Sequence, residues 1–262
     1  MLLCGAARTQ EPPQEPPPGP VILQNTGKPI TVPLHCTDED VQWAGLSCTL
    51  ADPCPAYLEI SAVEGVGDRI FAAGDIHSVA LTLFSLLLAS EDGGRTWREA
   101  HERMRGAGLD HIQFADAGHV WISGEELFPL TRNPFFLVTA DGGESWRTQP
   151  LSDEPRGGFI QQFQFDGAKN GSLVVDRGPG AGKGRYELYE SRDGGANWSL
   201  KEGNATPPAL KSQPQPSAWR ARADGATHSF QIERQAGGRW TPVAAFAVQL
   251  GSCKPGDETD PR

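Results

Sequence analysis

Apolar positions along the chain fall into short runs that alternate with polar positions or are rich in β-branched and aromatic residues. The runs recur in pairs. In each pair, a run of the first set is followed, after a Gly or Asp turn signal, by a run of the second set. The runs are residues 58–63, 111–114 and 160–165 in the first set and 69–74, 119–124 and 172–178 in the second. An apolar period of two between turn residues predicts β-strands. The pattern therefore predicts an all-β chain built from a repeated group of strands.

An octet of similar residues follows each group of strands. Each copy starts with Ser or Thr, contains Asp-Gly-Gly, and ends with Thr, Ser or Asn before Trp; the copies are residues 90–97, 139–146 and 191–198. Their tryptophans, Trp97, Trp146 and Trp198, are spaced by 49 and 52 residues, which is long enough for one four-stranded unit. A nearly constant period of this length indicates a repeat protein. A degenerate fourth copy keeps Gly-Gly and Trp240 but has lost the Asp.

The octet is typical of a β-hairpin turn, in which Asp accepts backbone N–H groups and the glycines adopt positive φ. Trp then begins the next strand. Burial of Trp contributes about 3–5 kcal/mol, against about 1 kcal/mol for a hydrogen bond, so we expect Trp146→Ala to lower the melting temperature more than Asp141→Ala. The predicted structural residues are Asp92, Gly93, Gly94, Trp97, Asp141, Gly142, Gly143, Trp146, Asp193, Gly194, Gly195 and Trp198.

The octets resemble the Asp-box, or BNR repeat, of sialidases, sortilin-type domains and photosystem II assembly factors, all of which are β-propellers. The resemblance covers about residues 57–202, and the whole chain also resembles a bacterial family of exported proteins with such repeats. It implies an all-β fold, a small β-propeller of about four to five blades with Asp-box hairpins. A curved array that does not close into a ring is the alternative. The resemblance does not imply a particular activity.

Composition shifts divide the chain. We expect residues 1–7 to be the remnant of a signal peptide, 8–20 a Pro-rich linker, 21–56 a Cys-rich N-terminal cap with a strand at 29–34, and 254–262 a disordered tail. The propeller is expected to span 57–253, with blades at about 57–100, 109–151, 159–203 and 217–250. The last strand, 243–250, is expected to close the ring or to pair with the N-terminal strand, because an unpaired edge favours aggregation.

The chain has five cysteines, and their pairing indicates the cellular compartment in which the protein folds. Cys4 lies in the short leader remnant, which leaves four cysteines and three possible pairings. We favour Cys48–Cys54 as a local link and Cys36–Cys253 as a tie between the chain ends, the latter contributing at most about 5 kcal/mol; reduced, buried cysteines are the alternative. Disulfides suit an exported protein, so we expect a bacterial periplasmic or extracellular location.

The net charge of −10 argues against nucleic acid or an anionic membrane surface as a partner, because both require clustered Lys and Arg. Six scattered histidines show no zinc-ligand spacing, and residues 178–184 lack the Ser or Thr of a phosphate-binding loop. We therefore predict no metal, no cofactor and no transmembrane segment, and we expect a monomer.

Two functions remain. A sialidase-like glycoside hydrolase would need an early Arg-Ile-Pro motif, where this chain has Arg69-Ile70-Phe71, together with Tyr and Glu, which residues 186–190 offer within a predicted strand. A non-catalytic exported interaction or scaffold module for a protein or glycan fits better, and catalytic residues are not predicted. Loops carry recognition on a rigid scaffold, and the most distinctive loop mixes acidic and aromatic residues. Its candidate contacts are Glu125, Glu126, Phe128 and Phe135, with an ordinary packed loop as the alternative.

Overall fold

A computed structural model describes residues 21–127, 133–152, 156–210 and 216–254. These residues form four antiparallel β-sheets, one short α-helix, α1 (Asp38–Trp43), and one 3-10 helix, η1 (Pro179–Gly184). The predicted all-β class with repeated propeller-type blades is confirmed, because strands account for nearly all of the regular structure and recur as blade-like sheets. The helix η1 occupies the Gly-rich stretch in which the sequence analysis looked for a phosphate-binding loop.

Each sheet is built from strands that follow one another in the chain, except that the first sheet also takes in β17 from the C-terminal part. The first sheet has the order β1 (Leu23–Gln24), β5 (Thr96–Glu99), β4 (Thr82–Ser90), β3 (Arg69–His77), β2 (Cys54–Val66) and β17 (Gln249–Cys253). The second comprises β6 (Ala107–Phe114), β7 (Val120–Glu126), β8 (Asn133–Thr139) and β9 (Arg147–Pro150). The third comprises β10 (Phe159–Asp166), β11 (Asn170–Asp176), β12 (Tyr186–Ser191) and β13 (Ser199–Asn204), and the fourth β14 (Trp219–Asp224), β15 (Ser229–Ala236) and β16 (Arg239–Ala247).

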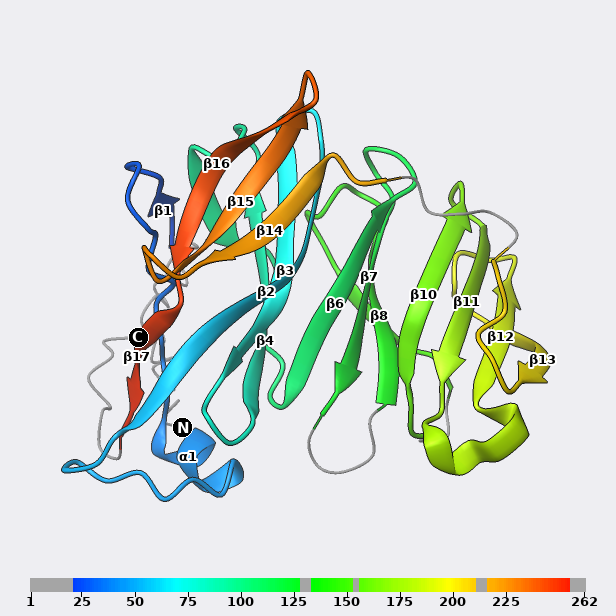
Figure 1. Ribbon diagram of the computed structural model, residues 1–262, viewed down its shortest axis with the longest axis horizontal. Coiled ribbons are helices and arrows are strands. Elements are labelled where there is room, and N and C mark those ends of the chain that lie inside the picture. The colour runs from blue at the N-terminus through cyan, green and yellow to red at the C-terminus, as the bar shows by residue number, and fades with distance from the viewer. Residues whose placement is uncertain (1–20, 128–132, 153–155, 211–215, 255–262) are drawn as a thin grey trace, which may run out of the picture.

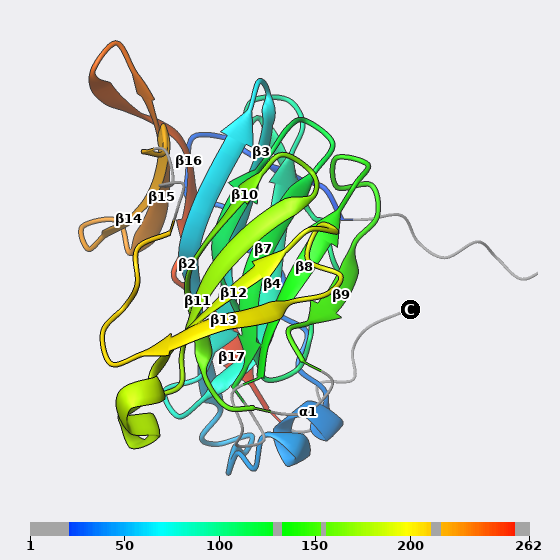
Figure 2. The same ribbon diagram turned by 90° about the vertical axis from the view of Figure 1, so that its right-hand side faces the viewer.

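The four sheets stand side by side in an open row. Figure 1 shows the fourth sheet at one end, followed by the first, the second and the third. Figure 2 looks onto the third sheet, with the strands of the other sheets behind and beside it. The sheet that comes last in the sequence therefore packs beside the first, while the third ends the row. The arrangement corresponds to the curved array that does not close, with four sheets as its blades.

The three octets make the same hydrogen bonds. In each one, the leading hydroxyl donates to the Asp carboxylate, at 2.9 Å for Ser90–Asp92, 2.6 Å for Thr139–Asp141 and 2.8 Å for Ser191–Asp193. The six glycines have φ between 74° and 95°, a region that favours Gly. The first Gly of each pair donates its N–H to a carbonyl of the same sheet's first hairpin, 2.9 Å from Asp68, Gly118 and Lys169 respectively. Each octet thus holds the two hairpins of its sheet together.

These hydrogen bonds also set the ionisation of the octet carboxylates. Burial opposes ionisation of Asp92, but hydrogen bonds from Thr96, Ser90 and Arg95 outweigh it and lower its pKa to about 2. Hydrogen bonds from Ser145 lower the pKa of Asp141, and those from Asn197 lower the pKa of Asp193. The three turns therefore rely on ionised aspartates.

Aromatic side chains on the second strand of one sheet pack against the next sheet. Phe71 of β3 stacks on Phe114 of β6 with ring centroids 5.6 Å apart, and Trp121 of β7 stacks on Phe165 of β10 at 4.0 Å. Trp121 also donates its indole N–H to the carbonyl of Gly194 in the third octet, at 2.9 Å. The repeat in the sequence is thus also a repeat of the contacts between neighbouring sheets.

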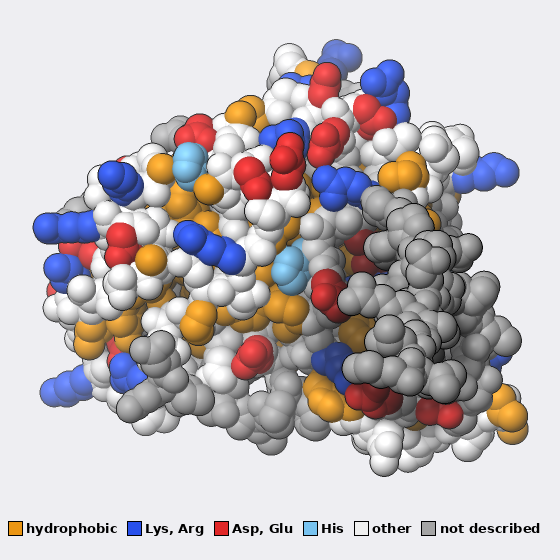
Figure 3. Space-filling view, turned by 180° about the vertical axis from the view of Figure 1, so that it is seen from behind, with side chains coloured by type: hydrophobic (Ala, Val, Ile, Leu, Met, Phe, Trp, Pro, Cys, Tyr) orange, Lys and Arg blue, Asp and Glu red, His pale blue; other side chains and the backbone are white. Residues whose placement is uncertain are grey.

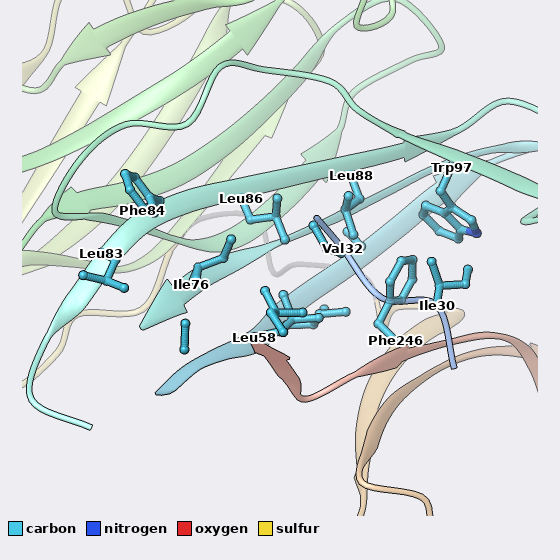
Figure 4. Packing of buried hydrophobic residues seen from close by; sticks show 14 of the residues in the cluster. Ile30, Val32, Leu58, Ile76, Leu83, Phe84, Leu86, Leu88, Trp97 and Phe246 are labelled. Atoms are coloured by element: carbon cyan, nitrogen blue, oxygen red, sulfur yellow. The ribbon is translucent and has the colours of Figure 1, made fainter. Parts of the chain in front are cut away.

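The largest apolar cluster lies between the first and fourth sheets and includes the N-terminal segment. Trp97 packs edge-on against Phe246 of β16 with ring centroids 5.3 Å apart. Ile30 and Val32 lie beside them in Figure 4. The strand expected at 29–34 is not formed: Ile30 makes a single bridge to Phe246, and the N-terminal strand is β1, which pairs with β5.

Two disulfides and one strand pairing connect the N-terminal and C-terminal parts of the described chain to the first sheet. Disulfides link Cys36 to Cys253 and Cys48 to Cys54, the two pairs favoured from the sequence. The stretch expected as one strand at 243–250 is divided, because β16 belongs to the fourth sheet whereas β17 pairs with β2 of the first. The end of the described chain thus adds a strand beside the first strand of the first sheet.

Candidate functional site: two clefts beside the second and third sheets

The first strands of three sheets each contain a β-bulge at the same place. The pairing register shifts between Ile60 and Ala62 in β2, between Leu109 and His111 in β6, and between Ile160 and Gln162 in β10. The extra residues are Ser61, Asp110 and Gln161. A bulge re-aims side chains and is over-represented beside functional sites. The repeated bulge therefore marks this region as a candidate site.

Glycine next to each bulge allows the two backbones to approach closely. A Cβ on Gly74 would lie 1.9 Å from the carbonyl oxygen of Glu59, and one on Gly124 would lie 2.6 Å from that of Gly108. The third sheet has Val175 at this place, but Gly158 leaves room on the opposite strand. The runs 69–74 and 119–124 of the sequence end at these glycines, but the strands β3 and β7 continue beyond them to His77 and Glu126.

The bulge residues line one cleft of about 350 Å³, which we call the inner-strand cleft. Its walls come from the first strands of three sheets and the end of β7. The lining residues are Ser61, Asp110, His111, Glu125, Phe159, Ile160 and Gln161. Gln161 Oε1 is buried and has no hydrogen-bond partner among the described residues.

Asp75 adds to the negative charge near this cleft. Its pKa is raised to about 6, mainly by burial; His77 opposes this shift, and the charges of Glu59 and Asp110 add to it. Its equivalent in the third sheet, Asp176, is ion-paired with Arg185 at 2.7 Å. The hydrogen bond from Arg185 lowers the pKa of Asp176. The repeated acidic position therefore has opposite surroundings in the first and third sheets.

A larger cleft of about 490 Å³ opens between the second and third sheets, and we call it the inter-sheet cleft. Its lining combines apolar and aromatic side chains with two arginines. The lining residues are Glu126, Asn133, Pro134, Phe135, Thr148, Pro150, Leu151, Ser152, Arg156 and Arg177. The Arg156 side chain is 50% exposed, so it can also contact a ligand, whereas that of Arg177 is 8% exposed.

The structure divides the predicted partner loop between the two clefts. Glu125 lines the inner-strand cleft, whereas Glu126 and Phe135 line the inter-sheet cleft. Phe135 is only 4% exposed, so it contributes mainly to packing. Phe128 lies outside the described residues. Sequence reasoning did not find Asp110 and Arg156, which reach the clefts because a bulge and a neighbouring sheet place them there.

The Tyr and Glu considered for a sialidase-like enzyme form a closed network with the two arginines that line the inter-sheet cleft. The Tyr189 hydroxyl donates to Glu187 at 2.6 Å, and Arg177 donates to Glu187 at 2.7 Å and to the Tyr189 hydroxyl at 3.0 Å. Arg156 lies 3.1 Å from the other oxygen of Glu187. Tyr186 points to another cluster, where Arg185 lies over its ring.

This network does not activate the phenol. Burial and the hydrogen bond to Glu187 both raise the pKa of Tyr189. Burial would raise the pKa of Glu187, but hydrogen bonds from Tyr189 and Arg177 outweigh it and lower the pKa. Tyr189 therefore remains a hydrogen-bond donor, whereas a nucleophile would need a lowered pKa or a base free to accept its proton.

Metal ligands, surface charge and membrane-spanning helices can also be assessed in the described part of the chain. No group of three His, Cys, Asp or Glu side chains is arranged to hold a metal ion in the described part of the chain. Figure 3 shows acidic and basic side chains interspersed on the face seen from behind. Among the helices of residues 21–127, 133–152, 156–210 and 216–254, none has the length and apolar character needed to cross a membrane.

Comparison with known proteins finds partial similarity. The chain is 25% identical over 174 residues to the photosystem II stability/assembly factor HCF136, chloroplastic, of Arabidopsis thaliana, a match that covers 64% of this chain. The relative fits the repeat type that the octets indicate. The chain spans 37% of that relative's length, and no protein family model matches it.

Two solved structures are also similar. The crystal structure of the GH74 xyloglucanase from Xanthomonas campestris shares 18% sequence identity, with 72% of this chain and 28% of that chain covered and a TM-score of 0.41. YCF48 from Cyanidioschyzon merolae shares 17% identity, with 72% and 56% covered and a TM-score of 0.36. At TM-scores below 0.5, these likenesses are too distant to inform the site.

Proposed function

We propose that this chain acts without catalysis as an exported interaction or scaffold module, whose partner is a protein or a glycan, and that a partner protein binds in the inter-sheet cleft. The similarity to an assembly factor supports a scaffold role. The two disulfides suit an oxidising compartment outside the cytoplasm. The chain is proposed to act as a monomer.

One observation carries the proposal: the inter-sheet cleft combines an apolar wall with the half-exposed guanidinium of Arg156. Aromatic residues and Arg are enriched among the residues that dominate protein interfaces. Arg156 donates through Nη2 to Glu187 at 3.1 Å and through Nη1 to the Tyr189 hydroxyl at 3.5 Å, which leaves three of its five N–H groups for a partner. The volume is within the range of specific ligand sites, about 300–1,000 Å³.

A photo-crosslinking amino acid in the cleft tests the proposal. We would place it at Thr148, which is exposed in the cleft, and at Val79, which is 83% exposed and not part of the cleft, and incubate each protein with envelope extract of the source organism. A discrete crosslinked protein is expected only from Thr148. Arg156→Ala should lower its yield about tenfold, and Arg192→Ala, at an exposed arginine outside the cleft, should leave it unchanged.

The same experiment can contradict the proposal. Identical crosslinked species from Thr148 and Val79, or a yield that is insensitive to Arg156→Ala, would mean that the inter-sheet cleft does not hold the partner. A sialidase-like activity is supported less well, because Tyr189 and Glu187 are bound to each other and to Arg177. Mass analysis of sialylated oligosaccharides incubated with the protein tests that alternative directly.

A further inference from the structure

The inner-strand cleft has a lining that the proposed function does not use. Three successive sheets present a residue to it from the same bulge: Ser61 from β2, Asp110 from β6 and Gln161 from β10. In a regular strand, successive side chains alternate between faces, and the extra residue of a bulge breaks this alternation. Repetition of the same irregularity in three sheets brings three polar side chains to one cavity.

The chemistry of this lining is uneven. Carboxylate, amide and hydroxyl groups supply most of the polar lining, and the His111 ring can donate or accept, whereas neither Lys nor Arg is among the lining residues that the structure describes. The buried Gln161 Oε1 has no hydrogen-bond partner among the described residues. Ionised carboxylates accept hydrogen bonds and donate none. The cleft therefore suits a ligand that brings several hydrogen-bond donors.

Phe159 completes the lining with a half-buried aromatic ring beside Ile160. An aromatic ring offers a flat apolar surface, and small-ligand sites commonly combine such surfaces with a few placed polar groups. A pyranose ring has this dual character, since it has an apolar C–H face and a rim of hydroxyl donors. The volume of about 350 Å³ is in the range of small-ligand sites.

We propose that the inner-strand cleft binds a neutral saccharide, with Asp110, Glu125 and Gln161 accepting from its hydroxyl groups and Phe159 packing against a sugar ring. The proposal goes beyond the proposed function, because it concerns a different cleft and names the kind of glycan, a neutral saccharide, that this cleft would bind.

The charge around the cleft separates this ligand from acidic sugars. Asp110 and Glu125 line the cleft, and the charges of Asp110 and Glu59 both act on Asp75, where His77 acts in the opposite sense. An anionic sugar would bring a like charge to this group, and the described lining of the cleft offers neither Lys nor Arg to receive it, which is unfavourable. The cleft should therefore reject sialylated sugars. A cationic peptide is the competing ligand class, and it is included in the test.

Isothermal titration calorimetry of the full chain tests the proposal. The probes are the neutral hexasaccharides of cellulose, mannan, amylose and chitin, with 3′-sialyllactose as the anionic probe and hexalysine as the cationic probe. At least one neutral hexasaccharide is expected to bind with a Kd on the order of 1 mM or tighter. Sialyllactose is expected to show no heat of binding.

Variants of the lining residues test whether the measured heat of binding comes from the inner-strand cleft. Asp110→Asn preserves the shape of the side chain but exchanges one acceptor oxygen for a donor, and Gln161→Ala removes the amide; each should weaken binding about tenfold. Gln164→Ala is the matched control, because Gln164 lies on the same strand but does not line the cleft. Its affinity should match that of the wild type, and circular dichroism checks that all variants are folded.

Three results would overturn the proposal: no heat from any neutral probe at about 10 mM, binding that Asp110→Asn and Gln161→Ala leave unchanged, or tighter binding of hexalysine or sialyllactose. None of these results bears on a protein partner in the inter-sheet cleft. Conversely, a failed crosslink at Thr148 leaves the saccharide titration as it stands. Mass analysis of the titrated sugar would reveal cleavage, which would refute the non-catalytic role and leave the binding site intact.

Discussion

The first octet and the later two have nearly the same residues but different surroundings. Trp97 is 1% exposed and donates its indole N–H to the carbonyl of Gly94 at 3.1 Å. Trp146 and Trp198 are only partly buried, and their indole nitrogens have no hydrogen-bond partner among the described residues. In the first sheet, an additional strand, β1, pairs with the outer edge of β5, the strand that begins at the end of the first octet. Among the described residues, the second and third sheets have no such additional strand.

The difference comes from what packs against each octet. Leu23 of β1 pairs with Trp97, and the side-chain amide of Asn25 donates to Gly94 and to Val243 of the fourth sheet, each at 2.8 Å. Within the residues that the structure describes, the second and third octets contact a neighbouring sheet but no such segment. One local motif thus closes the same turn three times, while its contribution to stability depends on distant parts of the chain.

Replacement of Trp97 should have the largest effect. Trp97→Ala is expected to lower the free energy of unfolding by about 3–5 kcal/mol, because it leaves a cavity between the first and fourth sheets. Trp146→Ala should cost about half as much, since its ring is partly exposed, but should still lower the melting temperature more than Asp141→Ala. Urea denaturation of the variants measures both differences, and equal losses for Trp97→Ala and Trp146→Ala would remove the contrast between the two octets.

Acid pH should distinguish Asp75 of the first sheet from Asp176 of the third. The folded-state pKa of Asp75, about 6, exceeds its ordinary value of 3.8, so the folded state binds this proton more tightly than the unfolded state. Stability from this group is therefore present at low pH and is lost as pH rises from about 4 to 6. The lowered pKa of Asp176 has the opposite sign, and its contribution is lost as pH falls below the ordinary value of 3.8.

Asp75→Asn should remove the loss of stability that accompanies the ionisation of Asp75 as pH rises. At pH 8 the variant is expected to be more stable than the wild type, by at most about 3 kcal/mol, since one pKa unit corresponds to about 1.4 kcal/mol. At pH 4 the two proteins should differ little. Melting curves between pH 4 and 8 measure this difference, and a parallel shift at every pH would show that the charge of Asp75 is not its origin.

The side chain of Asn25 should have the smallest effect of the three. Asn25→Ala removes the hydrogen bonds to Gly94 and Val243 and should cost about 1–2 kcal/mol. Thr26→Ala is the control, because Thr26 is exposed and adjacent in the chain. Hydrogen exchange at β5 should accelerate in Asn25→Ala, while exchange at β9 and β13 should not change. Faster exchange in all three strands would indicate a global loss and not a loss of the added strand.

Much of the fold follows from local features of the sequence. The octet turns, the alternation of strand residues and the spacing of Trp97, Trp146 and Trp198 are local or periodic, so they predicted the all-β repeat and its sheets. The favoured cysteine pairs also occur in the structure. The candidate site was harder to predict from the sequence. Glu125, Glu126 and Phe135 do line clefts, but Glu125 lines one cleft and the other two residues line another.

The sequence by itself determined the turns and the strands, because a hairpin turn and the alternation of a strand depend on residues a few positions apart. Only the tertiary structure decided that the row of sheets stays open, that β1 and β17 both join the first sheet, and that three bulges meet in one cleft. These features depend on which distant surfaces are buried together. Apolar burial is non-directional and leaves no local mark for such choices.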